Sequence, residues 1–442
     1  MKAAVKLKDS LKSFLQKLII TFQLYGNNGL SNHAAACAYG FLFSMAPMLL
    51  LIVSLILYIF KPSGQAVIAL MAHVPFIDII FDEQWLTSNF LSAITGLSGI
   101  LSAAGIFWSA GILGLSIKRG LKIIFPSAKK RNTVINTFVS LALEIGVLVF
   151  ILIAIIGSRA ARRFYLLIGF SPKSPVMNLI ASQIGMNVFY IVLMGLAAYF
   201  IYLYVPENTP RRFSAFCGAL LFVITSYCTA MLLGFILNIS RINFLYGALG
   251  NIIILLVNVY FFFTFFFLGA QLVYVMDSFD SLLFSKLRQI KTASVHAKKL
   301  QIVNLFNNLI FHIDSSLSKY LQFYKKNEII FSQGSSGDDI YYLLEGEVEV
   351  LLSLPPGTGN SSSVSTGVLT AGSFFGEMGY LLSENRAATI KALTDCTVFS
   401  LPPSLFEAII KNDTSLDMEI IEHMSRRLKN TNQQIIAMKS KI

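Results

Sequence analysis

Six long apolar stretches constrain the fold of this chain more than any other feature. Each holds the roughly 20 mostly apolar residues that a helix needs to cross a bilayer. They lie at about residues 34–60, 91–117, 136–158, 184–205, 214–237 and 248–276. Only 13% of the 442 residues are charged, against about a quarter in soluble domains. We therefore predict an integral membrane protein with six transmembrane helices.

The distribution of charge predicts two domains. Charged residues are sparse from residue 31 to 276 but recur every few positions after residue 286. Residues 1–280 are assigned to the membrane domain, 281–300 to a connector and 301–442 to a domain in water. Short apolar alternations separated by glycines indicate strands in this second domain. The predicted fold class is therefore multi-domain: an all-α transmembrane bundle followed by an α+β domain with a β-roll and a C-terminal helix.

The second domain is expected to begin with a helix. Apolar residues at helical spacing, from Ile302 to Ile313, predict a helix over 301–324. Strands are expected at 328–331, 341–344, 348–352, 387–393 and 397–401. Residues 353–367, which are rich in Ser, Gly and Pro, predict a flexible hairpin tip. A last helix is predicted from Leu416 to about Lys439.

The basic balance of the chain is explained by its membrane topology. The net charge is +12, but much of the Lys and Arg flanks the apolar stretches, where it would face lipid headgroups. With the N-terminus inside, the inner segments carry more Lys and Arg than the outer ones, although the outer loop after the third stretch has four. An even number of spans then places both termini in the cytoplasm. Membrane lipid is the expected partner, and nucleic acid is not.

Some polar residues lie at the predicted depth of the membrane. Glu144, Asn187, Asn258 and Gln271 should face the bundle interior or a wet cavity, because an unpaired polar group in lipid is costly. For the amides we favour hydrogen bonds between helices. For Glu144 a functional role is about as well supported as a structural one. The four cysteines have no metal-ligand spacing, so no metal site is predicted.

Five segments of the membrane half form a recognisable series, in the order Ala34–Pro47, Phe107–Gly111, Tyr204–Asn208, Tyr246–Gly250 and Leu268–Leu272. In this order they resemble the YihY/BrkB family of bacterial inner-membrane proteins. The chain departs from the family at Asn258, where such proteins tend to carry Trp. The resemblance implies a multi-pass inner-membrane protein with six helices, linked to envelope integrity and to movement of lipid or solute. Relatives have been labelled as a ribonuclease, but the five histidines are isolated from one another and from carboxylates, so we expect no enzyme.

A loop in the second domain pairs a carboxylate with a planar cation. Phe375-Gly-Glu377 and Arg386-Ala-Ala-Thr389 place Glu377 and Arg386 nine positions apart. Together with the Phe331–Gly334 turn, this pattern resembles the cyclic nucleotide-binding domain over about residues 301–442. The resemblance implies that Glu377 accepts the ribose 2′-hydroxyl and that Arg386 binds the cyclic phosphate. Backbone N–H groups around the loop would complete a ligand site formed by Gly376, Glu377, Met378, Arg386, Ala387 and Ala388.

The resemblance also bears on the choice of ligand. Ala387 stands where a Thr tends to accompany cGMP preference, so cAMP is favoured over cGMP. Arg426-Arg-Leu428 is similar to a stretch that precedes the adenine contacts of Crp-type activators, which implies base contacts from Thr431 and Asn432. The chain ends at Ile442, so we expect no DNA-binding helix-turn-helix. A homodimer through the last helices is plausible, and no cofactor other than the regulatory nucleotide is expected.

Two other functions compete with a nucleotide-regulated envelope or transport protein. A cyclic nucleotide-gated ion channel would need a filter loop between the last two spans and a helix with Arg at every third position. The connection from Asn238 to Gly247 is too short for such a filter, and no span carries the Arg series. A membrane enzyme would need a nucleophile, base or metal grouping, and the sequence contains no recognisable one.

Overall fold

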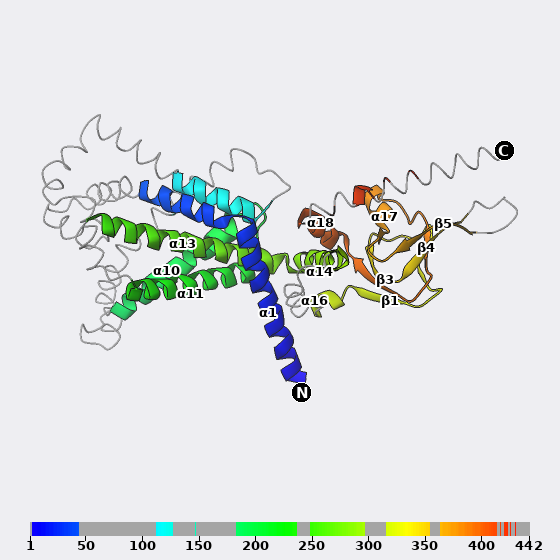
Figure 1. Ribbon diagram of the computed structural model, residues 1–442, viewed down its shortest axis with the longest axis horizontal. Helices are drawn as coiled ribbons and strands as arrows, with labels where there is room; N and C mark the ends of the chain where they lie inside the picture. Colours follow the sequence, from blue (N-terminus) through cyan, green and yellow to red (C-terminus); the bar gives the residue numbers. More distant parts are fainter. Residues whose placement is uncertain are drawn as a thin grey trace, which may run out of the picture. The chain divides into compact units, whose positions relative to one another are not determined.

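The computed structural model in Figure 1 describes residues 2–43, 112–126, 183–236, 248–296, 315–353 and 363–412, with single positions at 146, 416, 420–422, 425 and 429. The chain divides into two compact units. One is Leu18–Asp277, and the other is Ser278–Ile442 with Met1–Lys17. Glu144, Thr431, Asn432 and most of the first three apolar stretches lie outside the described residues.

The unit of residues 18–277 is helical. Its described part includes three helices long and apolar enough to cross a membrane: α10 (Gln183–Tyr204), α11 (Arg212–Ile236) and α13 (Ala248–Asp277). Figure 1 shows the three side by side. Large apolar side chains such as Phe200, Phe216 and Met231 are more than half exposed, as expected for helices that face lipid. The predictions at 184–205, 214–237 and 248–276 are confirmed as apolar helices.

Glycines allow α11 and α13 to touch through their backbones. A Cβ atom added at Gly269 would lie 2.6 Å from the carbonyl oxygen of Gly218 and 2.8 Å from the hydroxyl oxygen of Tyr202. Tyr202 of α10 is fully buried and donates a hydrogen bond of 2.6 Å to the carbonyl of Phe266. Close contact at small residues is typical of helices packed in membranes. The crossing therefore holds α10, α11 and α13 together.

The last residue of α13 closes the same bundle. The carboxylate of Asp277 accepts a hydrogen bond of 2.9 Å from the backbone N–H of Arg211 and another from the hydroxyl of Ser214. These groups lie at the N-terminus of α11, where backbone N–H groups lack helical partners and favour a negative charge. Asp277 thus caps α11 from the end of α13.

The described part of the C-terminal unit contains two antiparallel sheets of four strands each. One has the order β1-β8-β3-β6 and the other β2-β7-β4-β5. The strands are β1 (Leu321–Tyr324), β2 (Ile329–Phe331), β3 (Ile340–Glu345), β4 (Glu347–Ser353), β5 (Ser363–Thr370), β6 (Phe374–Phe375), β7 (Thr389–Ala392) and β8 (Cys396–Leu401). Buried residues of both sheets, among them Leu343, Val348 and Val398, form one core. The predicted strand-rich domain is confirmed.

Two details of the sequence prediction for this unit are wrong. The helix expected over 301–324 does not include Leu321–Tyr324, which forms β1 and pairs with β8. The hairpin tip expected at 353–367 is strand at its far end, because residues 363–367 belong to β5, which pairs with β4. β1 pairs with β8, far along the chain, and β5 pairs with the strand before its loop. Both pairings use backbone hydrogen bonds, which the periodicity of side chains does not reveal.

Helix α14 (Phe279–His296) covers most of the residues predicted as a connector and packs on the sheets. The ring of Phe284 meets the rings of Tyr342 and Phe399 edge-on, at centroid distances of 5.3 and 5.4 Å. α14 also packs against α18 (Pro403–Asn412). These residues are therefore part of the folded C-terminal unit.

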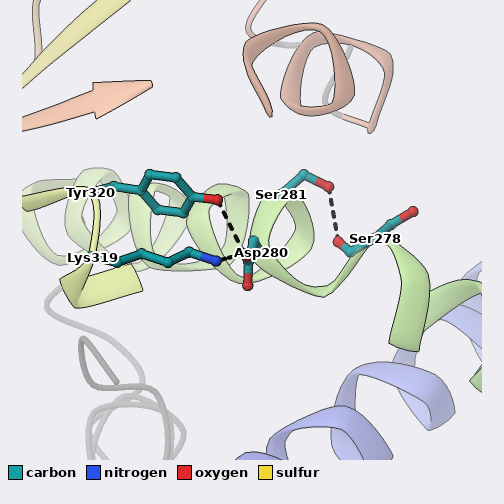
Figure 2. Close-up of polar contacts among 5 residues, drawn as sticks. All are labelled: Ser278, Asp280, Ser281, Lys319 and Tyr320. Atoms are coloured by element: carbon teal, nitrogen blue, oxygen red, sulfur yellow. Dashed lines mark hydrogen bonds and ion pairs between the residues drawn. The ribbon is translucent and has the colours of Figure 1, made fainter. Parts of the chain in front are cut away.

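Polar contacts fix the start of α14, as Figure 2 shows. Asp280 accepts a hydrogen bond of 2.8 Å from the ammonium of Lys319 and one of 3.3 Å from the hydroxyl of Tyr320. Lys319 and Tyr320 follow α16 (Ser315–Ser318), just before β1. The carbonyl of Ser278 accepts hydrogen bonds from the hydroxyl of Ser281 and the backbone N–H of Leu282. Hydrogen bonds thus hold the first turn of α14 internally and also link it to the residues just before β1.

Replacing Lys319 with methionine is expected to have a small effect that disappears at high pH. The hydrogen bond to Asp280 raises the pKa of Lys319 above its ordinary value. The hydrogen bond therefore adds its full share to the free energy of unfolding below the ordinary lysine pKa, about 10.4. This stabilisation is lost as the pH rises through the higher folded-state pKa. Because the Lys319 side chain is 55% exposed, solvent screening limits the loss at pH 7 to less than about 1 kcal/mol. Unfolding midpoints of the two proteins at neutral and alkaline pH check this expectation.

Candidate nucleotide-binding site

The predicted loop joins β6 to the short helix α17 (Glu377–Leu382). The turn depends on Gly376, whose φ of 81° lies in the left-handed region that favours glycine. A Cβ atom there would also lie 2.8 Å from Nη1 of Arg386. Any side chain at residue 376 would therefore strain the backbone and displace the arginine.

Arg386 is the most constrained side chain of the site. It is only 4% exposed. Its Nη1 donates to the carbonyl of Gly376 and its Nη2 to the carbonyl of Asp339, each at 2.8 Å. Backbone hydrogen bonds of Arg386 with Gly334 and Ser335 hold this residue against the turn after β2. The loop and the turn predicted from sequence thus come together at the guanidinium.

The guanidinium keeps hydrogen-bonding capacity for a ligand. A guanidinium has five N–H donors, and the two carbonyls occupy two of them. The edge formed by Nε and Nη2 faces Gly337, where an added Cβ would lie 3.2 Å from Nη2 and 3.5 Å from Nε. A side chain at residue 337 would press against this edge, and glycine avoids that contact. An anion with two oxygens, such as a phosphate, suits this geometry.

Within the described ranges, the contacts of Arg386 include no carboxylate. They are the two carbonyls and two aromatic rings, those of Phe331 and Tyr341. A buried cation is costly unless a negative charge accompanies it. The arrangement is therefore suited to receive an anionic ligand.

The other predicted residues of the loop lie around this cation. Glu377 is the first residue of α17 and is 4% exposed, so the structure buries the predicted carboxylate and the predicted cation in one loop. Met378 is 44% exposed. Ala387 is exposed and Ala388 half-buried. A ligand at the guanidinium could thus reach the loop from solvent.

Sequence reasoning did not place Tyr341 and Asp339 at the site, and it used Phe331 only as the start of a turn in the recognised pattern. Phe331 ends β2, and Tyr341 lies near the start of β3. Burial raises the pKa of the Tyr341 hydroxyl, with Arg386 acting in the opposite direction. This side chain is therefore a neutral ring at physiological pH. The aromatic residues around the turn at 335–339 were the available signal, but only the pairing of the strands brings them to Arg386.

The polar residues of the membrane half differ in their surroundings. Gln271 is fully buried and accepts a hydrogen bond of 3.3 Å from the side chain of Asn28, which lies in a turn between two helical segments. Asn258 is exposed, and its amide donates to the carbonyl of Ile254 in its own helix, at 2.8 Å, while its place in the bundle interior stays a prediction. A helix carbonyl one turn away satisfies this amide without a neighbouring helix. Asn187 is also exposed, contrary to expectation.

Two family models match the chain, one for each half. Residues 21–283 match the model described as Virulence factor BrkB, and residues 321–413 match the cyclic nucleotide-binding domain. The second match covers the loop, the turn and both sheets described above. The residues that enclose Arg386 are thus those of a cyclic nucleotide-binding domain.

Individual relatives share only part of the chain. The cAMP-activated global transcriptional regulator CRP of Pasteurella multocida is 30% identical over 114 residues, which are 25% of this chain and 52% of that protein. Lysophospholipase nte1 of Neosartorya fischeri is 26% identical over 130 residues, which are 29% of this chain and 8% of that protein. This chain thus spans about half or less of the length of these curated relatives.

Solved structures are similar over a comparable fraction of the chain. The catabolite activator protein of Thermus thermophilus is 23% identical with a TM-score of 0.25, covering 33% of this chain and 62% of that one. The cAMP-bound PfPKA-R is 33% identical with a TM-score of 0.19, covering 21% of this chain and 31% of that one. The assignment of the C-terminal half rests on the family model and on the residues around Arg386.

Proposed function

Since this chain belongs to the Virulence factor BrkB family and carries a cyclic nucleotide-binding domain, we propose that it is a bacterial envelope protein of transport type regulated by a cyclic nucleotide. The nucleotide binds at the loop of Gly376, Glu377, Met378, Arg386, Ala387 and Ala388. It acts as a regulatory ligand, and neither half is proposed to be an enzyme.

The observation that carries this proposal is the buried guanidinium of Arg386. It is 4% exposed, is held by two backbone carbonyls, and has no carboxylate among its described contacts. A cyclic phosphate supplies the missing negative charge and accepts charge-assisted hydrogen bonds from the remaining N–H groups. Glu377, buried in the same loop, accepts the ribose 2′-hydroxyl. Arg386 thus binds the phosphate, and Glu377 binds the ribose hydroxyl of the same ligand.

We propose cAMP in preference to cGMP. Ala387 offers no hydroxyl at the position where Thr accompanies cGMP preference in related domains. Thr431 and Asn432 are the proposed contacts of the adenine base. The activation of the Pasteurella multocida relative by cAMP, as its name states, supports this choice.

We place the protein in the inner membrane, with both termini in the cytoplasm, where a nucleotide messenger can reach the site. The exposed Arg211 and Arg212 at the start of α11 support this orientation. Pairing of the last helices in a homodimer is part of the same proposal. Membrane lipid surrounds the apolar helices.

Binding of cAMP and cGMP to the full chain in lipid nanodiscs tests the proposed function. We expect saturable calorimetric binding of cAMP that is stronger than that of cGMP. The full chain is needed because α14 packs on the sheets, and a fragment beginning within α14 would cut this helix. If neither nucleotide binds, the proposal is wrong.

Replacing Glu377 with glutamine is expected to weaken cAMP binding and to reduce discrimination against 2′-deoxy-cAMP, because the remaining amide oxygen accepts only an uncharged hydrogen bond. The wild type should prefer cAMP by about 10-fold or more, because a hydrogen bond to a charged group contributes about 1.5–3 kcal/mol. Glutamine keeps the shape but lacks the charge. Calorimetry with both ligands on both proteins measures the difference. A preference for cAMP that is equal in the two proteins would contradict the proposed role of Glu377.

Regulation of the membrane half is proposed to pass through α17, α18 and α14. The hydroxyl of Tyr380 in α17 donates to the carboxylate of Glu407 in α18, and its ring meets Phe406 edge-on at 6.1 Å. α18 in turn packs on α14, whose sequence follows α13 directly. Closure of the last helix over the ligand would shift these elements and bias the helix bundle. If solute or lipid movement in vesicles is unaffected by saturating cAMP, the regulatory part of the proposal fails.

A further inference from the structure

Two aromatic rings from different sheets enclose the guanidinium of Arg386. Its central carbon lies 4.5 Å from the ring centroid of Phe331 and 5.5 Å from that of Tyr341. Phe331 belongs to β2 in one sheet and Tyr341 to β3 in the other. At these distances the negative face of an aromatic ring attracts a planar cation. The arginine therefore has contacts of two kinds, with carbonyls at its N–H groups and with rings.

The rings are themselves held in place. Tyr341 stacks on Phe375 with a centroid distance of 5.3 Å and an interplanar angle of 11°. Phe331 also contacts Phe375, at 6.1 Å. Phe375 is 1% exposed and belongs to the core between the sheets. The orientation of the rings is thus determined by the packed core, before any ligand binds.

The carbonyls and the rings restrict different motions of the guanidinium. Hydrogen bonds to Gly376 and Asp339 fix two N–H directions in the guanidinium plane. Contacts with aromatic rings oppose movement of the group away from them. A phosphate that needs two parallel N–H donors then meets them already aligned, and binding does not have to order a flexible side chain.

We propose that Phe331 and Tyr341 are positioning residues for the ligand, acting through Arg386. This inference rests on the proposed function, because it assumes that Arg386 binds the phosphate of a cyclic nucleotide. It adds a determinant of affinity outside the Phe-Gly-Glu and Arg-Ala-Ala-Thr loop. Phe331 is the better test site, since it is half-buried at the end of a short strand, whereas Tyr341 stacks directly on the core residue Phe375.

Calorimetry of the full chain in nanodiscs with cAMP tests this proposal on four proteins: the wild type, Phe331→Leu, Phe331→Tyr and Phe374→Leu. Phe331→Leu is expected to bind cAMP about 3- to 30-fold more weakly than the wild type, because it loses the contact between the guanidinium and the ring. Phe331→Tyr keeps a ring and should bind within about twofold of the wild type. Phe374→Leu is the matched control, because this buried ring contacts Tyr342 and Phe406 and has no recorded contact with Arg386.

The unfolding midpoint of each protein without nucleotide separates positioning from folding. If Phe331→Leu does not fold, Phe331→Met takes its place as an unbranched apolar substitution. The inference is overturned if the variant lacking the ring binds cAMP like the wild type, or if Phe374→Leu weakens binding equally. A wild-type chain that binds neither cAMP nor cGMP overturns the proposed function, and this inference with it. Binding by the wild type that is unchanged in Phe331→Leu overturns the inference alone.

Discussion

Replacing Arg386 with lysine is expected to abolish tight binding of cAMP, although the positive charge is retained. An ammonium cannot donate in the plane to both Gly376 and Asp339 while presenting two further parallel N–H groups to a phosphate. It also lacks the planar group that lies against Phe331 and Tyr341. Removing one partner of a buried charged pair costs about 2–5 kcal/mol, so affinity should fall at least about 30-fold.

Calorimetry of the full chain with cAMP measures this loss, and Arg386→Ala should behave similarly. The matched control is Lys411→Ala, which removes an exposed cation at the end of α18. This control should bind cAMP like the wild type. If Arg386→Lys binds within about threefold of the wild type, the site needs only a charge and the geometric argument is wrong.

Replacing Gly269 with alanine is expected to destabilise the membrane unit strongly. The new Cβ would lie 2.6 Å from the carbonyl oxygen of Gly218 and 2.8 Å from the hydroxyl oxygen of Tyr202. One of these atoms is backbone, so α11 and α13 must separate to relieve the contact. Over-packing in a tight interior typically costs about 1–3 kcal/mol, and we expect the upper end of this range.

The thermal unfolding midpoint of the detergent-solubilised chain, together with its monodispersity, measures the effect at Gly269. Gly26→Ala in helix α1 (Lys2–Asn27) is the matched control, because an added Cβ there would meet nothing within 4 Å. This variant should be neutral or slightly stabilised, since alanine favours helix more than glycine does. An unchanged midpoint for Gly269→Ala would show that the close backbone contact does not hold the helices together.

The elements predicted best from the sequence are those whose signal lies within their own residues, such as helices that must be apolar to lie in lipid. α10, α11 and α13 were predicted because a helix in lipid must be apolar on most of its surface, which leaves a long and simple signal. Strands β3 and β4 were predicted from apolar alternation around Gly346, where φ is 98°. Strand β1 was missed because its partner β8 lies about 75 positions later in the chain. Strand β5 was missed because Ser, Thr and Gly suit a loop, while its pairing with β4 depends on backbone groups.

The site was predictable only in its charged residues. Glu377 and Arg386 stand in a motif with fixed spacing, and the structure buries both. Phe331 and Asp339 come from other segments, and the aromatic residues around the turn at 335–339 do not by themselves indicate contact with Arg386. Such contacts depend on how β2 and β3 are placed in their two sheets. The amide of Asn258 bonds to a carbonyl of its own helix, a partner that the prediction of bonds between helices did not consider.

Ser278 is the only residue between the end of α13 at Asp277 and the start of α14 at Phe279. Its carbonyl is already engaged by Ser281 and Leu282, and Asp280 is held by Lys319 and Tyr320. On the other side, Asp277 is held at the start of α11. The boundary between the two units thus falls within a single turn of the chain, and the hydrogen bonds on each side of it stay within the unit to which that side belongs.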